Sequence, residues 1–389
     1  MAGRPPPGTA MSITVCIGAK TLYYPEGGGH LWVYLNWALG LRELGCHVIW
    51  LEEVAPQIPV EETQKYVSFL RRRLERYGLA ERVALCALAQ EALPPELTAD
   101  CLDFEATTQA DVLLNFNYDL APSVIARFRR SALVDIDPGL LQIWASNGQL
   151  RLERYDTYFT IGETVGRPGA RFPDLGLQWH YTPPCVSLRW WSPHQALDDA
   201  PFSTVVHWFA SSWTTDVAGP DDKRTGFLPY LDLPRRTTQP LELAINLGPD
   251  DSEWVAKERA TLSQHGWRLR DAHAVASTPW DYQGYIQASR GEFSCAKPSC
   301  LRLQTAWISD RTLCYLASGK PAVVQHTGPS RFLPDAAGLF RFRTVEEAAR
   351  ALKTVAADHE RQSRLARALA EEHFDARNVV ARVLEQVLV

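Results

Sequence analysis

The sequence predicts an α/β protein made of two successive modules, each a parallel sheet covered by helices. Three observations predict this class. Short β-rich runs alternate with helical stretches from the first residues onward, a proline-rich stretch at 181–201 interrupts the alternation, and the alternation then begins again. Strands that alternate with helices form parallel sheets. The 389 residues, 46% of them hydrophobic, suit two or three domains of ordinary size.

The first module opens with a strand–helix–strand unit. The run ITVCI at 13–17 is followed by a glycine loop, a helix over 31–44 and the strand HVIWLEEV at 47–54. The helix is apolar nearly all round, so we expect it to be buried. The later elements of this module are an amphipathic helix at 64–79 and strands at 111–116, 131–137 and 156–162.

The second module repeats this alternation and ends in helices. Its strands are expected at 203–209, 241–247, 291–296 and 321–325, and its helices at 252–264, 280–289 and 311–317. Thr344 and Glu347 have the spacing of a capping box, which predicts a further helix after them. Apolar residues at helical period then continue to the end of the chain.

These patterns divide the chain into five parts. We expect a disordered extension at 1–11, a first domain at 12–185, a linker at 186–202, a second domain at 203–370 and a final helix at 371–389. The final helix is free to cross back to the first domain. The extension has no apolar core of a signal peptide.

Composition excludes several classes of protein. A net charge of -5 disfavours a nucleic-acid binder held by bulk charge, and no apolar run reaches the roughly 20 residues that span a bilayer. The eight cysteines are scattered without a C-x-x-C pair, which favours a reduced, cytoplasmic location. The ten histidines lack metal-ligand spacing, so no metal site is expected.

Three glycines stand beside a histidine in the loop after the first strand. Glycine permits positive φ and a close approach of the backbone to a ligand, and ligands bind at the carboxyl edge of parallel sheets. The loop has Gly27, Gly28 and Gly29, followed by His30 in the first turn of the helix. The helix dipole disfavours an imidazolium there, so a neutral imidazole can serve as a general base. The alternative is a tight turn in which His30 only caps or packs.

The segment from Gly27 to Glu52 resembles the first strand–helix–strand unit of GT-B glycosyltransferases, which have two Rossmann-like domains facing across a cleft. The matching features are Gly29-His30, the helix through Leu39 and the entry Gly45-Cys46-His47-Val48 into the second strand. The resemblance implies that His30 deprotonates the acceptor hydroxyl and that Gly27–Gly29 form the acceptor loop.

Such a histidine usually needs a carboxylate to hold its tautomer. In the family this carboxylate comes from the loop after about the fourth strand, where DVLLNFNYDL offers Asp119. The nearby sequence DIDPG offers Asp135 and Asp137 as well. We expect Asp119 to orient His30, and we interpret Asp137-Pro138-Gly139 as a turn.

The stretch from residue 289 to 328 joins a strand, a loop, a helix and another strand. Ser309, Asp310 and Thr312 suit a helix N-terminus, whose free N–H groups favour a diphosphate. Nearby cations can neutralise the phosphate charge unless they are ordinary surface residues. The three cations are Arg290, Lys297 and Arg311.

The segment Ala317–Val324 resembles the end of the GT-B donor helix, which continues as Ala-x-Gly-x-Pro-Val-Val. The resemblance implies a nucleotide diphosphate sugar as co-substrate, with no cofactor and no metal. It also implies that the donor sugar meets the polar residues after the next strand, which are Gln325, His326, Thr327 and Gly328. The paired glutamates of retaining members are absent, with Cys314 near the second position, and the Gly-Gly of plant-type inverting members is also absent.

The sequence therefore predicts a hexosyltransferase that acts on a hydroxyl or amine of a small-molecule acceptor, with inversion at the anomeric carbon. Two alternatives remain open: a nucleotide-sugar epimerase of the same fold, and a non-catalytic protein that binds nucleotide sugars. An epimerase would need several carboxylates around the sugar, and the sequence offers no clear set near the donor loop.

Overall fold

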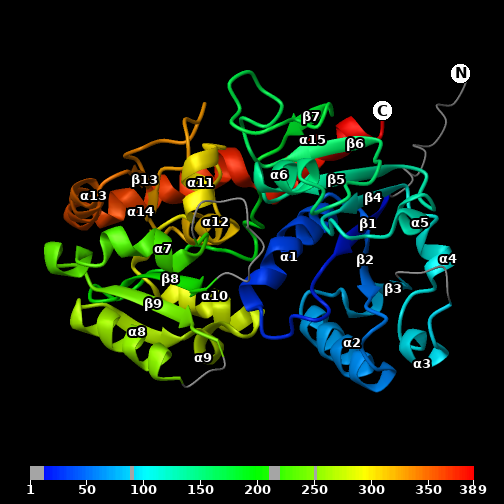
Figure 1. Cartoon of the computed structure of the whole chain (residues 1–389), viewed down its shortest axis with the longest axis horizontal. Helices are drawn as coiled ribbons and strands as arrows, with labels where there is room; N and C mark the ends of the chain where they lie inside the picture. The colour runs from blue at the N-terminus through cyan, green and yellow to red at the C-terminus, as the bar shows by residue number, and fades with distance from the viewer. Residues whose placement is uncertain (1–12, 88–91, 210–219, 249–251) are drawn as a thin grey trace, which may run out of the picture.

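The computed structural model describes residues 13–87, 92–209, 220–248 and 252–389, which form two parallel sheets flanked by helices (Figure 1). The first sheet has the strand order β3-β2-β1-β4-β5-β6-β7, and all its neighbouring strands are parallel. Its strands are β1 (Thr14–Ala19), β2 (His47–Val54), β3 (Val83–Ala87), β4 (Val112–Asn115), β5 (Ser131–Asp135), β6 (Thr157–Thr160) and β7 (Trp179–Tyr181).

The second sheet has the order β10-β9-β8-β11-β12-β13 and is also parallel throughout. Its strands are β8 (Phe202–His207), β9 (Leu241–Asn246), β10 (Arg268–Asp271), β11 (Gly291–Ser294), β12 (Ala322–Gln325) and β13 (Leu339–Phe342). The predicted α/β class with two parallel-sheet modules is confirmed.

Helices connect the strands of each sheet. Those of the first module are α1 (Gly28–Glu43), α2 (Val60–Glu75), α3 (Pro95–Thr98), α4 (Phe104–Thr107), α5 (Pro122–Ile125) and α6 (Leu140–Ser146). Those of the second are α7 (Lys223–Phe227), α8 (Glu253–Gln264), α9 (Ala272–Ala276), α10 (Pro279–Ala288), α11 (Pro298–Leu303) and α12 (Asp310–Ala317). The chain ends with α13 (Val345–Ala357), α14 (His359–Leu369), one π-helical turn (Ala370–Phe374) and α15 (Ala376–Val387).

The sequence pattern did not predict four of the strands, and all four are the outermost strands of their sheets. They are β3, β7, β10 and β13. An edge strand pairs on one side only, and such strands are often short. Three or four residues with mixed exposure, as in β7 and β10, carry too little periodicity to be recognised without the neighbouring strand.

Helix α1 begins earlier than expected, and its glycines serve another purpose than positive φ. The helix starts at Gly28 with Gly27 as N-cap at φ −95°, and Gly28 and Gly29 therefore lie in its first turn. A Cβ atom on Gly28 would lie 2.2 Å from the carbonyl oxygen of Thr278, and one on Gly29 would lie 2.6 Å from the ring of Tyr282. The glycines therefore let α1 approach the second module closely.

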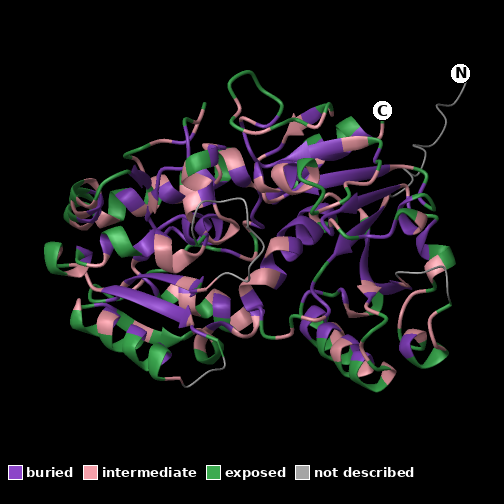
Figure 2. Cartoon of the chain, viewed as in Figure 1, coloured by how far each residue is buried: buried purple, intermediate pink, exposed green. Residues whose placement is uncertain are grey.

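Helix α1 joins one hydrophobic core that both modules share. The indole Nε1 of Trp32 donates a hydrogen bond of 2.7 Å to the carbonyl oxygen of Pro279. The ring of Trp32 lies 4.8 Å from that of Trp191, in the segment between the sheets. Figure 1 shows α1 between the two modules, and Figure 2 shows most of its length buried.

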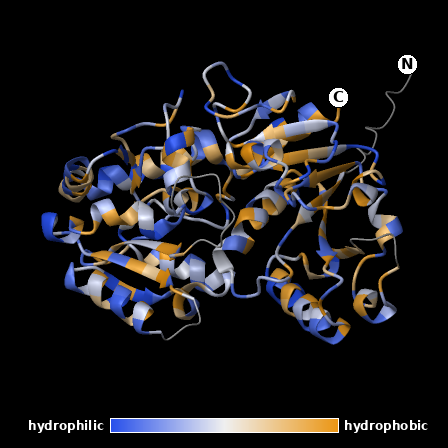
Figure 3. Cartoon of the chain, in the orientation of Figure 1, coloured by the Kyte–Doolittle hydropathy of each residue, from blue (hydrophilic) through white to orange (hydrophobic). Residues whose placement is uncertain are grey.

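The final helix packs against the first module. A Cβ atom on Gly40 of α1 would lie 2.8 Å from Ala376, at the start of α15. The sheets occupy residues 14–181 and 202–342, and the domain boundaries proposed from the sequence remain a prediction. Figure 3 shows the apolar residues concentrated in the central strands and on the inner faces of helices. Within the described ranges, no helix is long and apolar enough to cross a membrane.

Replacing Gly28 by alanine should destabilise the protein, because the new methyl group would collide with backbone atoms of the opposite module. We expect G28A to lower the free energy of unfolding by roughly 1–3 kcal/mol, as overpacking does. Urea denaturation followed by circular dichroism measures this. The matched control is G284A in α10, where a Cβ atom meets nothing within 4 Å. Equal stability of the two variants would refute the close contact.

Candidate active site

A cavity of about 340 Å³ lies between the two modules. The first turn of α1 forms one wall, and the second module forms the other. The residues from the first module are Tyr24, Glu26, Gly27, Gly28, Gly29, His30 and Val33. Those from the second are Val205, Val206, His207, Asn246, Ala272, His273, Ala276, Tyr282, Ser309, Asp310 and Arg311. The predicted base and the predicted helix N-terminus therefore line one cavity.

The imidazole of His30 is held by a backbone carbonyl. Its Nε2 lies 2.8 Å from the carbonyl oxygen of Lys20. A carbonyl only accepts, so Nε2 carries the hydrogen and the lone pair is on Nδ1. The rings of Tyr24 and Tyr34 meet the imidazole edge-on at 5.4 and 5.3 Å.

Burial lowers the pKa of His30, and the nearby charge of Lys20 lowers it further, while the hydrogen bond to the Lys20 carbonyl opposes them. The ring is therefore neutral at pH 7, as a general base requires.

Asp119 does not orient His30. Its carboxylate forms an ion pair with the ammonium group of Lys20, and the hydrogen bond to His30 comes from the carbonyl of the same lysine. The expectation of a carboxylate partner is corrected accordingly. Lys20 directly follows β1 and lies between the two side chains, so the aspartate reaches the lysine before it can reach the histidine.

The start of α12 supplies the opposite wall. Ser309 is the N-cap residue, and Asp310 and Arg311 occupy the first turn. Burial raises the pKa of Asp310 to about 7; the hydrogen bond from its own amide and the charge of Arg311 oppose this, and Asp137 adds to it. Thr312 is buried within the helix and does not line the cavity.

Arg311 is already engaged by neighbouring strands. Its Nε donates to a carboxylate oxygen of Glu292 at 2.8 Å, and one Nη donates to Ser294 Oγ at 2.7 Å. The other Nη donates to the carbonyl oxygen of Val205 at 3.1 Å. Arg311 therefore ties the ends of β8 and β11 beneath the cavity, which limits its freedom to follow a ligand.

Two lysines lie near this wall. The Nζ of Lys223 donates a hydrogen bond of 2.6 Å to the carbonyl oxygen of Cys295. Burial, and then the charge of Arg311, lower the pKa of Lys223 to about 8. Lys297 follows β11, and among the described residues its ammonium group makes no hydrogen bond or ion pair. Lys297 was predicted from the sequence, whereas Lys223 was not.

Asp137 approaches this wall from the first module. It accepts a hydrogen bond of 3.1 Å from the hydroxyl of Tyr118, and its backbone carbonyl accepts one of 3.0 Å from Leu141 at the start of α6. Burial raises the pKa of Asp137, while the bond from Tyr118 and the charge of Lys297 lower it. The turn interpretation describes its backbone, but its side chain also faces charges of the second module.

The four residues at the end of β12 and just after it contact neighbouring loops and strands instead of lining the cavity. The amide of Gln325 is occupied by the Ala296 N–H at 3.0 Å and the Tyr230 hydroxyl at 3.1 Å. His326 accepts a bond from the Gly328 N–H at 3.1 Å, and the hydroxyl of Thr327 donates to the carbonyl of Trp307. The contact of Thr327 holds the segment before α12, and none of the four residues lines the interdomain cavity.

Arg290 lies at the opposite end of the strands of the second sheet. It precedes β11, whereas Lys297 follows it, so the two cations are at opposite ends of one strand. The Arg290 side chain pairs with Asp198 at 3.1 Å, in the segment before β8. The expected place of Arg290 in a donor site is therefore corrected.

Several other lining residues were not predicted from the sequence. His207 and Asn246 end β8 and β9, and His273 lies in the first turn of α9. The rule that ligands meet the carboxyl ends of parallel strands would have identified the first two. His273 Nδ1 lies 2.9 Å from a carboxylate oxygen of Glu26, across the two modules. In the described part of the chain, no three His, Cys, Asp or Glu side chains are placed to share a metal ion.

Comparisons with known proteins identify the architecture. No family model and no curated protein matches the chain by sequence. Among solved structures, an α-glucosyltransferase in complex with UDP and a 13-mer DNA matches with a TM-score of 0.59 and 11% identity, over 97% of this chain and 100% of the other. A sucrose-phosphate synthase from Thermosynechococcus elongatus matches with a TM-score of 0.54 and 12% identity, over 96% and 98% of the two chains.

HepE from Anabaena, in complex with UDP and glucose, matches with a TM-score of 0.55 and 11% identity, over 96% and 99% of the two chains. These neighbours have the GT-B fold, and the similarity extends over nearly the whole of each chain. The chain therefore has the GT-B fold, as its two modules and the interdomain cavity suggested.

The raised pKa of Asp310 predicts a pH-dependent stability. Because the folded state holds its proton up to about pH 7 and the unfolded state only to about 3.8, stability from this group is full below pH 4 and is lost as pH rises through 7. Between pH 5 and pH 8, we expect the free energy of unfolding of D310N to rise by about 1–3 kcal/mol relative to that of the parent. Urea unfolding at both pH values measures this. The control is D199N, at an exposed position; equal pH responses of the two variants would contradict the prediction.

Proposed function

We propose that the protein is a glycosyltransferase that moves a sugar from a nucleotide diphosphate sugar to a hydroxyl or amine of a small-molecule acceptor. One observation carries this proposal: His30 and the start of α12 line the same interdomain cavity. A proton acceptor and a helix N-terminus thus face one space. The GT-B neighbours, two of them in complex with UDP, support the nucleotide sugar.

In the proposed reaction, Nδ1 of His30 takes the proton of the acceptor hydroxyl. The acceptor oxygen then attacks the anomeric carbon, and the bond from that carbon to the diphosphate oxygen breaks with its electron pair on the diphosphate. Attack from the face opposite the leaving group inverts the anomeric carbon. The lowered pKa of His30 supports this role, because the free ring is neutral before the reaction.

The second module would stabilise the leaving diphosphate. Free N–H groups at the start of α12 are suited to phosphate oxygens, and the ammonium groups of Lys297 and Lys223 supply positive charge nearby. A diphosphate beside Lys223 would favour its charged form, which burial now disfavours. In this proposal protein cations neutralise the leaving group and no metal ion is needed.

A small acceptor agrees with the charge of the protein better than DNA does. One neighbouring structure contains DNA, but the net charge of this chain is -5, and phosphate backbones bind to basic surfaces. The eight cysteines are all free, which supports a reducing compartment such as the cytoplasm. We propose a hexose as the transferred sugar.

Epimerisation of a nucleotide sugar is a second candidate function. The feature that favours it is the approach of two carboxyl groups, Asp137 of the first module and Asp310 of the second, where the charge of Asp137 raises the pKa of Asp310, because epimerases place carboxylates around the sugar. The assay that separates the candidates incubates the protein with labelled UDP-glucose, with and without acceptors. Acceptor-dependent release of UDP supports transfer, interconversion of the sugar supports epimerisation, and binding without turnover supports a non-catalytic protein.

Replacing His30 by alanine should lower the rate of transfer about 10²–10⁴-fold, the usual contribution of general base catalysis. UDP binding should change little, since the proposed phosphate ligands are in the other module. Stopped assays with labelled UDP-glucose give the rate, and calorimetry gives the affinity for UDP. H194A, at an exposed histidine between the sheets, is the control. Full turnover by H30A would eliminate this base.

Chelation should leave transfer unaffected, because the proposed charge neutralisation comes from lysines and helix N–H groups. We expect the rate in EDTA to stay within about twofold of the untreated rate, whereas K297A should lower it at least about tenfold, the effect of losing a charged hydrogen bond to the phosphate. Loss of activity in EDTA, restored by a divalent cation, would contradict this assignment of the charge.

A further inference from the structure

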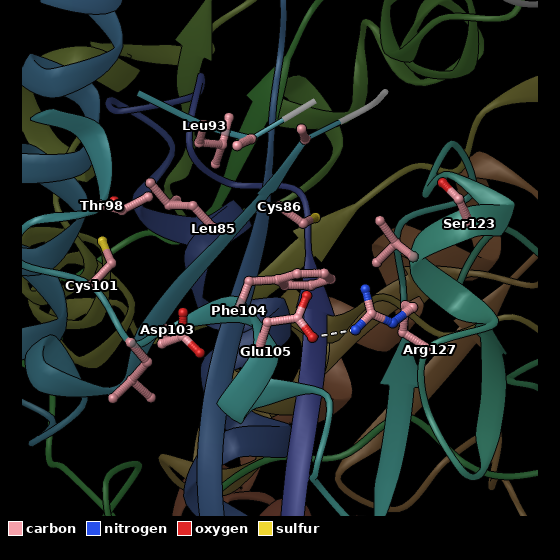
Figure 4. A pocket seen from close by; sticks show the side chains of 14 residues that line it. Leu85, Cys86, Leu93, Thr98, Cys101, Asp103, Phe104, Glu105, Ser123 and Arg127 are labelled. Atoms are coloured by element: carbon pink, nitrogen blue, oxygen red, sulfur yellow. Dashed lines mark hydrogen bonds and ion pairs between the residues drawn. The ribbon is translucent and has the colours of Figure 1, made fainter. Parts of the chain in front are cut away.

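A second cavity, of about 720 Å³, lies within the first module (Figure 4). It is bounded by the end of β3, by residues within 92–105, which include α3 and α4, and by residues of and just after α5. In Figure 4, Leu93, Thr98 and Cys101 lie on one side, Ser123 and Arg127 lie on the other, and the ring of Phe104 lies between them. The proposed reaction does not use this cavity.

The interior of this cavity suits an uncharged, apolar group. Leu85, Leu102, Phe104 and Val124 contribute hydrocarbon surface. Burial raises the pKa of the thiols of Cys86 and Cys101, so both are neutral and behave as small apolar groups.

The charged side chains of the wall already have partners. Asp103 accepts a hydrogen bond of 2.8 Å from the Ala106 N–H at the start of α4, and Glu105 pairs with Arg127. A ligand with an apolar body can therefore bind without breaking either of these interactions.

Strand register places this cavity on the same sheet edge as His30. Ala19 of β1 pairs with Glu52 of β2, which pairs with Leu85 of β3. Neighbouring strands lie about 4.8 Å apart, so the ends of β1 and β3 are about 10 Å apart. Lys20, whose carbonyl holds His30, follows Ala19, and Cys86 of the cavity follows Leu85.

Polar groups fill the interval between the cavity and His30. Cys16, Leu51 and Cys86 share one face of the sheet, and the alternation of side chains places Lys20 and Glu53 on that face too. Glu53 accepts hydrogen bonds from the Ala121 N–H at 3.2 Å and from Asn117 Nδ2 at 3.4 Å, and Lys20 pairs with Asp119. Helix α1 packs on the other face of the sheet, against Ile17 and Ala19, so the line from the cavity to the imidazole passes over the carboxyl ends of β2 and β1.

We propose that this edge binds an amphipathic acceptor. Its apolar tail fills the cavity at β3, α4 and α5, and its hydroxylated head lies across Glu53, Asp119 and Lys20, with one hydroxyl at His30. This assignment rests on the proposed function for the fate of that hydroxyl. Tail binding itself depends only on the cavity and is measured separately.

Alkyl glucosides are suitable probes, since they combine a hydroxylated head with a tail of chosen length. Hexyl β-D-glucoside should bind at least 100-fold more tightly than methyl β-D-glucoside, because each buried methylene contributes about fourfold. Isothermal titration calorimetry at concentrations below micelle formation measures both. Equal affinities for the two glucosides would overturn the proposal.

Filling the cavity should abolish the preference for the longer tail. S123W puts an indole at the wall formed by α5, and A126W puts one on the exposed side of the next turn, outside the lining residues. T98W fills the cavity from the opposite wall, with A99W as its exposed control, should S123W fail to fold. Loss of hexyl glucoside affinity in the filling variants alone supports the site, and unchanged affinity overturns it.

Two further measurements separate this proposal from the proposed function. UDP affinity, measured on the same variants, should be unchanged, since the donor wall is in the other module. With UDP-glucose present, the parent should glucosylate hexyl glucoside faster than methyl glucoside, and S123W should lose that difference. If UDP and hexyl glucoside both bind and UDP-glucose is consumed without transfer to hexyl glucoside, the acceptor assignment is wrong. Failure to bind UDP at all would instead refute the proposed function.

Discussion

The close contact between the first turn of α1 and the turn before α10 is the constraint on which the interdomain cavity depends. Gly28 and Gly29 allow this contact because any Cβ atom there would strike Thr278 or Tyr282. His30 lies in the same helical turn, so the contact that closes the modules also sets the imidazole in the cavity wall. The buried hydrogen bond from Trp32 to Pro279 fixes the helix one turn further along.

The charges around this contact are unevenly balanced. Arg311 and Glu292 form a buried pair, whereas the hydrogen-bond partner of Lys223 among the described residues is a single carbonyl oxygen and its pKa falls to about 8. A buried ammonium without a counter-charge is costly, and a bound anion removes that cost. Asp137 and Asp310 have the opposite problem, since burial favours their protonated forms. The site thus places a buried cation near carboxyl groups whose protonated forms burial favours.

The tautomer of His30 illustrates how a backbone group can replace a side chain. A carboxylate would stabilise an imidazolium as well as orient the ring, whereas the Lys20 carbonyl mainly orients it. In the proposed reaction, the proton would therefore be taken up by a ring whose charged form is disfavoured by burial. Prompt return of that proton to solvent or to a product would be favoured.

Local pattern determined the alternation of strands and helices, the buried character of α1 and the start of α12 near Ser309. These features depend on periodicity and capping within a few residues, which the chain carries in its order. The same pattern could also have placed Arg290 before β11 and away from Lys297, because the residues that precede and follow one strand lie at opposite ends of that strand.

Only the tertiary structure decided the four edge strands, the purpose of the glycines, the partner of Asp119 and the approach of Asp137 to Lys297. Each depends on a neighbour that is distant in the chain: Gly28 meets Thr278, and Asp119 meets Lys20. A residue's type states which contacts it can make, but the distance between two modules decides which of those contacts form. That distance is set by packing across the interface, and packing is a property of the folded chain.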